Sequence, residues 1–134
     1  MRLTVYSDGG SRGNPGHAAF AIVVCFGNDI IFEKSEYIGR ETNNIAEYRG
    51  LIAGIAKAID MKADDVEFVM DSELVIKQMR GEYKVKSPSL LDIHNDAKSL
   101  VSGIKKVKFT HVKRENKMIS RADALLNAEM DRHQ

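Results

Sequence analysis

The chain has 134 residues, of which 43% are hydrophobic and 29% are charged, so its composition is that of an ordinary soluble domain and excludes a disordered or fibrous chain. A formal net charge of +1 excludes a protein that coats nucleic acid by bulk electrostatic attraction. The one cysteine, Cys25, cannot form an internal disulfide, and no apolar run has the length of a membrane span. We expect a single domain over residues 1–134, without a secretory leader or membrane contact, monomeric and cytoplasmic.

Nine segments have the pattern of a strand or a helix. Alternation or β-branched apolar content predicts strands at residues 2–8, 18–26, 30–39, 66–71 and 105–112. Apolar residues at three- and four-residue steps, together with boundary residues, predict helices at residues 42–59, 72–81, 87–103 and 120–130. Gly81 would close the second helix, and Pro88 suits the first turn of the third.

The order of these elements predicts the class of fold. Three consecutive strands with short connections form an antiparallel meander, and the later strands, separated by helices, extend the same sheet. We therefore expect a mixed α/β fold, with a five-stranded mixed sheet and helices packed on both faces. If strands 2–8 and 66–71 are parallel neighbours, their carboxyl ends lie side by side at the edge where such sheets bind ligands.

Four acidic residues stand at element boundaries. Two would end the first and fourth strands, and two would lie in the first turns of the first and last helices; in that order they are Asp8, Asp71, Glu47 and Asp123. Four carboxylates at one edge would repel each other unless a cation held them together. Ligands that are all oxygen select Mg²⁺ or Mn²⁺ over zinc.

Each acid taken singly also has a structural explanation. Asp8 could close an Asx-turn before the glycines that follow it. Asp71 could cap the helix after it. Capping boxes begun by Asn44 and Ser120 could account for the two acids in helices.

Four motifs together resemble those of ribonuclease H type 1. They are YSDGGSRGNPG, TNNIAEYRGL, VMDSELVIKQMRGEYKVK and RADALLN, in the order and with roughly the spacing of that family. The resemblance covers nearly the whole chain. It implies a ribonuclease H-like fold and an endonuclease that cuts the RNA strand of an RNA/DNA hybrid, leaving 5′-phosphate and 3′-hydroxyl ends.

The resemblance also assigns roles to the four acids. Asp8, Glu47, Asp71 and Asp123 occupy the positions of the family's metal-binding catalytic acids. Two Mg²⁺ ions, or Mn²⁺ in their place, can activate a water molecule and stabilise the leaving oxygen of a phosphodiester. Asp8 and Asp71 would touch both ions, and the other two acids would each hold one.

Residues around the acids are predicted to bind the substrate. Backbone N–H groups of the SRGNPG segment suit a nucleic-acid backbone, and Asn43, Asn44 and Ser72 could contact a 2′-hydroxyl. By resemblance, Asn14 and Thr42 would help to seat a DNA phosphate; alternatively, these residues only build turns and caps. The full predicted set is Gly9, Gly10, Ser11, Arg12, Gly13, Asn14, Thr42, Asn43, Asn44, Ser72, Lys84, Lys86 and Arg114.

Three features depart from the family pattern. Glu73 stands where some members carry glutamine. The stretch from Gly81 to Leu90 leaves no room for the basic protrusion of some members, so the grip on the hybrid would rest on the C-terminal basic stretch and on Lys77, Arg80, Lys84 and Lys86. The loop histidine of many relatives is missing; His111 lies in a predicted strand and is expected to be structural, and Lys113 or Arg114 could replace the missing charge.

Two other functions are compatible with the sequence. One is a nuclease of the same fold that acts on another duplex, such as double-stranded RNA. The other is a hybrid-binding module without catalysis, against which the four acids argue because uncompensated carboxylates repel a polyanion.

Overall fold

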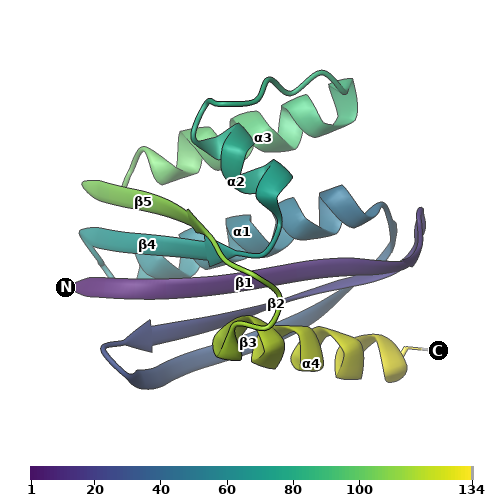
Figure 1. The fold of residues 1–134 in the computed structure, drawn as a ribbon, viewed down its shortest axis with the longest axis horizontal. Helices are drawn as coiled ribbons and strands as arrows, with labels where there is room; N and C mark the ends of the chain where they lie inside the picture. The colour runs from purple at the N-terminus through teal and green to yellow at the C-terminus, as the bar shows by residue number, and fades with distance from the viewer. Residues whose placement is uncertain (134) are drawn as a thin grey trace.

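A five-stranded mixed sheet forms the centre of the molecule in the computed structural model, which describes residues 1–133. Its strands, in chain order, are β1 (Arg2–Gly13), β2 (Gly16–Phe26), β3 (Asp29–Glu41), β4 (Asp65–Met70) and β5 (Lys106–His111). Their order in the sheet is β3-β2-β1-β4-β5 (Figure 1). The first three strands are antiparallel, whereas β4 is parallel to both β1 and β5. The predicted mixed α/β fold is therefore confirmed, including the parallel pair of β1 and β4.

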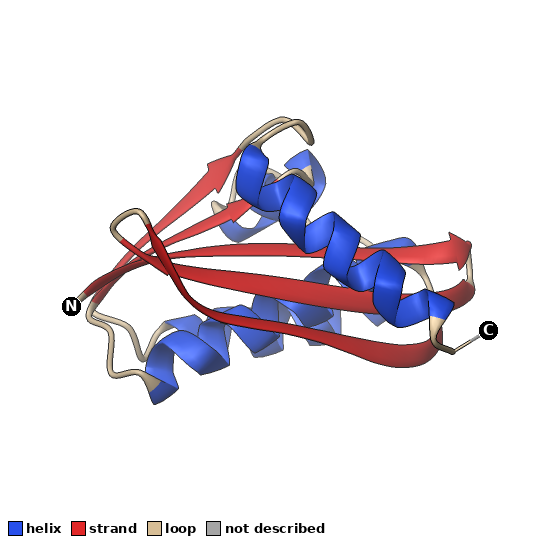
Figure 2. Cartoon of the chain, turned by 90° about the horizontal axis from the view of Figure 1, so that it is seen from below, coloured by secondary structure: helices blue, strands red, loops and turns tan. Residues whose placement is uncertain are grey.

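Helices cover both faces of this sheet (Figure 2). They are α1 (Asn43–Asp60), α2 (Glu73–Met79), α3 (Pro88–Val101) and α4 (Lys117–Asp131). The first three pack on one face around buried side chains such as Leu51, Ile55 and Phe68. Helix α4 packs alone on the other face, where the small side chains of Ala19 and Ala21 face it and let it lie close to the sheet.

Two element boundaries differ from the prediction by three residues or more, for identifiable reasons. Strand β1 does not stop at Asp8 but continues to Gly13, because its antiparallel ladder with β2 runs on to the pair Gly13 and Gly16. Helix α4 begins at Lys117 and not at Ser120, because the Asn116 side chain accepts hydrogen bonds from two N–H groups of the first turn. None of the helices in residues 1–133 has the length and apolar content needed to cross a membrane.

Candidate active site

The four acids line one hollow at the edge of the sheet. Asp71 directly follows β4, and Asp8 lies in β1 just beyond Tyr6, the last residue that pairs with β4. Helix α1 brings Glu47 to the same place from one face, and α4 brings Asp123 from the other. The convergence that the sequence predicted is therefore present.

A glycine allows α1 to approach this part of β1. A methyl group on Gly9 would lie 2.3 Å from the carbonyl oxygen of Ala46, a separation that real Cβ atoms do not tolerate. Gly9 therefore lets the backbones of β1 and α1 touch, next to Asp8 on the strand and Glu47 on the helix. The glycine pair that resembled a loop is a paired strand, so the Asx-turn explanation of Asp8 is wrong.

The capping explanations of the other acids are also wrong. Helix α1 is capped by Thr42, whose Oγ1 accepts from the Ile45 N–H at 3.3 Å. Helix α2 is capped by Ser72, whose hydroxyl accepts from the Val75 N–H at 3.3 Å. Glu47 and Asp123 both lie beyond the first turns of their helices. None of the four acids is used to begin a helix.

Burial and mutual repulsion disfavour ionisation of these acids. Asp8 is 6% exposed. Its burial, and after that the charges of the other three acids, raise its pKa to about 8. The Gly9 N–H, which donates a hydrogen bond to the Asp8 carboxylate at 3.0 Å, opposes this rise. Burial and the charge of Asp71 raise the pKa of Glu47 to about 7, against a hydrogen bond from Ser72 that lowers it. Such a site is expected to hold protons until a cation replaces them.

The pKa of Asp71 is also raised, chiefly by burial. A backbone hydrogen bond and, after it, the nearby guanidinium of Arg114 oppose this rise. Arg114 lines the same hollow, so the residue suggested as a replacement for the missing histidine charge lies at the site. His111 ends β5 with its ring nitrogen 4.0 Å from the carboxylate of Glu73, and neither residue lines the hollow.

The acids offer only oxygen ligands. Within residues 1–133, no three His, Cys, Asp or Glu side chains are already arranged around the position of a single ion. Mg²⁺ is commonly bound by one or two carboxylates, with water and substrate phosphate completing its shell. The four acids fit that manner of binding, in which the protein supplies part of each coordination shell.

Part of the predicted substrate-binding set surrounds the acids. The residues of this set that line the hollow are Gly9, Gly10, Ser11, Arg12, Asn43 and Arg114. The Ser11 hydroxyl is buried and has no hydrogen-bond partner among the described residues. Gly13 is the last residue of β1, just before the turn to β2, and has a φ of +98°. The half-buried Asn44 lies in the first turn of α1 without lining the hollow.

Asparagine side chains connect the β1–β2 region to the start of α1. Asn14 Oδ1 accepts from the backbone N–H of Asn43 at 3.0 Å. Asn43 Oδ1 in turn accepts from the backbone N–H of Ser11 at 3.3 Å. The first of these bonds brings the predicted phosphate-binding residue Asn14 close to Thr42, which precedes Asn43 in the chain. Asn43 lines the hollow, whereas Asn14 and Thr42 do not.

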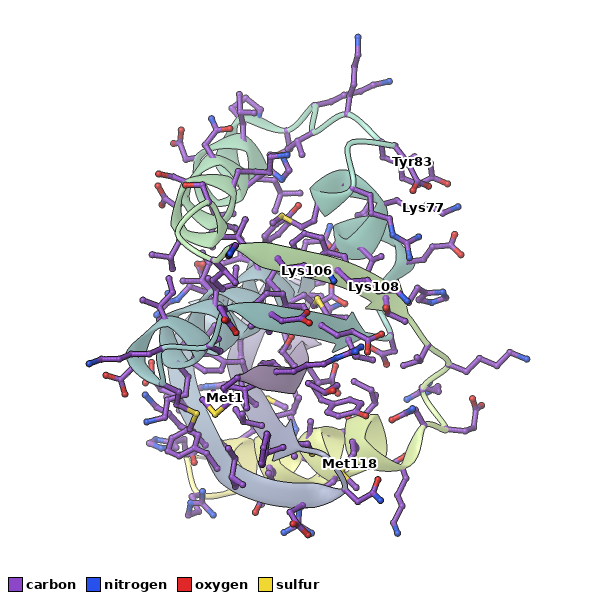
Figure 3. All side chains as sticks on the ribbon, turned by 90° about the vertical axis from the view of Figure 1, so that its left-hand side faces the viewer. Met1, Lys77, Tyr83, Lys106, Lys108 and Met118 are labelled. Atoms are coloured by element: carbon purple, nitrogen blue, oxygen red, sulfur yellow. The ribbon has the colours of Figure 1, made fainter. Side chains whose placement is uncertain are left out.

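Lys84 and Lys86 lie away from the acids. Both are exposed in the segment between α2 and α3 and do not line the hollow. Tyr83, which was not among the predicted site residues, lies beside them in the chain and is 45% exposed. Lys77 of α2 points toward it, with its Nζ 3.4 Å from the Tyr83 hydroxyl and 5.0 Å from the ring centroid (Figure 3). An exposed aromatic ring among lysines is typical of nucleic-acid-binding surfaces.

Three further residues of the hollow were also overlooked, and all come from α4. They are Leu126, Asn127 and Met130. Asn127 follows Asp123 by one helical turn, a spacing that places both side chains on one face of a helix. That spacing could have identified Asn127 from the sequence.

Comparison with known proteins identifies the family. The family model described as reverse transcriptase-like matches residues 6–128. The crystal structure of RNase H1 from Halobacterium salinarum superposes with a TM-score of 0.94 at 42% identity, covering 98% of this chain and 99% of that one. LC11-RNase H1, solved in complex with an RNA/DNA hybrid, has a TM-score of 0.91 at 37% identity, with 98% of each chain covered. The fold is thus ribonuclease H-like, and the chain belongs to the ribonuclease H type 1 family.

The curated mycobacterial relatives are longer proteins. The bifunctional protein Rv2228c of Mycobacterium tuberculosis is 42% identical over 133 residues, which are 98% of this chain but 36% of that protein. This chain therefore spans about a third of the length of that relative.

Proposed function

We propose that the chain is an endonuclease that uses divalent metal ions to hydrolyse the RNA strand of RNA/DNA hybrids, leaving 5′-phosphate and 3′-hydroxyl ends, and that it acts as a monomer. The observation that carries the proposal is the convergence of four carboxylates in one hollow of a chain from the ribonuclease H type 1 family. The relative solved with an RNA/DNA hybrid supports this substrate.

The four acids would hold two Mg²⁺ ions, with Mn²⁺ as an alternative. Asp8 and Asp71, which come from neighbouring parallel strands, would contact both ions. Glu47 and Asp123, which reach the hollow from opposite faces of the sheet, would each contact one. When bound, such ions supply an activated water molecule and neutralise the charge that develops on the leaving oxygen.

The chain's own residues prepare the site for that chemistry. Burial of Asp8 and Glu47 among like charges stores a repulsion that cation binding relieves. The Ser72 hydroxyl accepts from the Val75 N–H at the start of α2, and the same side chain lowers the pKa of Glu47. Arg114 adds a positive charge beside Asp71, which favours an approaching phosphate.

Selection of RNA would depend on the 2′-hydroxyl near the scissile phosphate. Asn43 lines the hollow, and Asn44 and Ser72 flank the acids. Amide and hydroxyl groups can both donate to and accept from a 2′-hydroxyl.

An assay with three labelled duplexes tests the proposal. RNA/DNA hybrid, double-stranded RNA and double-stranded DNA are each incubated with Mg²⁺, Mn²⁺ or EDTA. We expect cleavage of the RNA strand of the hybrid with either metal and none in EDTA. Cleavage of double-stranded RNA at a comparable rate would indicate the broader duplex nuclease, and binding without cleavage would indicate the silent module. A hybrid with one deoxynucleotide on the 5′ side of a cleavage position should resist cutting there.

A further inference from the structure

Asp123 is the least protected of the four acids. Its side chain is exposed, whereas Asp8 is buried and the other two acids are half-buried. Packing therefore does little to fix the direction of this carboxylate. Asn127, one turn further along α4, donates from Nδ2 to Asp123 Oδ1 at 3.2 Å and to the Asp123 carbonyl oxygen at 2.9 Å.

Arg12 of β1 determines which way the Asn127 amide points. Its Nη2 donates to Asn127 Oδ1 and to the Asn127 carbonyl oxygen, both at 3.3 Å. A guanidinium has donors only, so the amide oxygen must face Arg12 and the amide N–H₂ is left for Asp123. Asp131 accepts from the same Arg12 nitrogen, with its Oδ1 2.7 Å from Nη2, and so helps to hold the guanidinium against α4.

We propose that Asn127 is a positioning residue for Asp123, and that Arg12 and Asp131 hold Asn127 in the orientation that donates to the carboxylate. The inference rests on the proposed function, because it concerns the use of Asp123 as a metal ligand. Carboxylates that bind metals are commonly fixed by hydrogen bonds from a second layer of residues, and loss of such a bond lowers metal affinity or activity about 10–100-fold. A single donor on Oδ1 leaves the remaining lone pairs of the carboxylate to an ion.

The proposal changes the role expected for Arg12. The sequence places Arg12 in a segment that suits a nucleic-acid backbone, and an arginine there could contact a substrate phosphate directly. In the structure its guanidinium is engaged by α4. The two roles differ in the kinetic parameter that they change, because a phosphate contact affects the Michaelis constant and a positioning residue affects the use of the metal.

The first experiment compares Asn127→Ala with Asn95→Ala. Asn95 is an exposed asparagine within α3 and does not line the hollow, so it controls for the exchange of asparagine for alanine in a helix. We expect Asn127→Ala to raise the Mg²⁺ concentration for half-maximal hybrid cleavage about tenfold or more, with the Michaelis constant for hybrid unchanged. We expect Asn95→Ala to match the wild type. An unaltered Mg²⁺ dependence in Asn127→Ala would overturn the proposal.

A second measurement needs no substrate. Mn²⁺ should raise the melting temperature of the wild type, and the Mn²⁺ concentration needed for that rise should be about tenfold higher for Asn127→Ala. If the wild type failed to cleave hybrid, the proposed function would fail, but this titration would still test whether Asn127 supports a metal site. Identical titrations for the wild type and Asn127→Ala would count against the positioning role.

A double-mutant cycle separates the two roles of Arg12. Arg12→Met is made in the wild type and in the Asn127→Ala variant. If Arg12 acts through Asn127, its replacement should reduce the rate in the wild type and cause no further loss in Asn127→Ala. Equal losses in both backgrounds, accompanied by a higher Michaelis constant, would show that Arg12 contacts the substrate itself.

Discussion

Replacing Asp8 by asparagine should stabilise the metal-free protein, and the gain should grow with pH. Asparagine has nearly the shape of aspartate and can still accept the hydrogen bond from the Gly9 N–H. It removes a charge that is buried among three other acids. The native fold tolerates the protonated, neutral form of Asp8 far better than its ionised form.

The sign and the size of this change in stability follow from the pKa of Asp8. Because this pKa rises from 3.8 in the unfolded chain to about 8 in the folded one, the stabilising contribution of the protonated form is complete below about pH 4 and is lost as the pH rises through 8. A difference of roughly four units at about 1.4 kcal/mol each sets an upper limit near 6 kcal/mol. Relaxation and water entry around an ionised buried carboxylate reduce such penalties. We therefore expect Asp8→Asn to raise the free energy of unfolding by about 3 kcal/mol at pH 9.

Urea unfolding in EDTA at pH 5, 7 and 9, followed by circular dichroism, measures this effect. The free energy of unfolding of the wild type should fall from pH 5 to pH 9, whereas that of Asp8→Asn should fall much less, the remainder being due to Glu47 with its pKa of about 7. Asp92→Asn, which changes an exposed acid on α3, should behave as the wild type does. If Asp8→Asn raised the free energy of unfolding equally at pH 5 and pH 9, or lowered it at pH 9, the explanation by buried charge would be refuted.

Three further variants have definite expected results. Asp71→Asn should nearly abolish hybrid cleavage while unfolding in urea at the same or a higher concentration, because it removes a proposed metal ligand and relieves repulsion; near-normal activity would exclude a role in metal binding. Lys84→Ala combined with Lys86→Ala should raise the Michaelis constant for hybrid and reduce its logarithmic salt slope by about 1 for each lost phosphate contact, with little change in the maximal rate; a lower maximal rate alone would place these lysines in the chemistry. Tyr48→Phe should cost about 1–3 kcal/mol in urea unfolding, because the Tyr48 hydroxyl donates to the buried Gln78 side chain at 2.6 Å; no loss would mean that Gln78 finds another partner.

The fold was predictable where local periodicity agrees with the tertiary structure. The apolar repeat of α1 and the buried run of β2 have a single interpretation each, and the order of elements then limits the sheet to few arrangements. The extension of β1 to Gly13 was not predictable in this way. Its glycine-rich second half resembles a loop, and only pairing with β2, a contact between distant residues, makes it a strand.

The candidate site was likewise predictable in part. The acids were singled out because each was predicted to stand next to an element boundary and because their motifs resemble those of one family. In the structure only Asp71 directly follows an element, whereas Asp8 lies within β1 and Asp123 within α4. The hydrogen bonds between Arg12 and Asn127 were not predicted, because they join residues 115 positions apart and neither residue type marks a site by itself. The early start of α4 was missed for a related reason: the Asn116 cap lies in a polar segment with no apolar repeat.

The most direct test of the proposed metal-dependent hydrolysis is to identify the chemical groups at the ends of the RNA products. A hybrid with an end-labelled RNA strand is cleaved by the wild type in Mg²⁺, and a parallel reaction contains EDTA. We expect RNA fragments with 5′-phosphate and 3′-hydroxyl ends, an intact DNA strand, and no fragments in EDTA. Cleavage in EDTA, or fragments that end in 2′,3′-cyclic phosphate, would show attack by the RNA's own 2′-hydroxyl without the metal site and would contradict the proposed reaction.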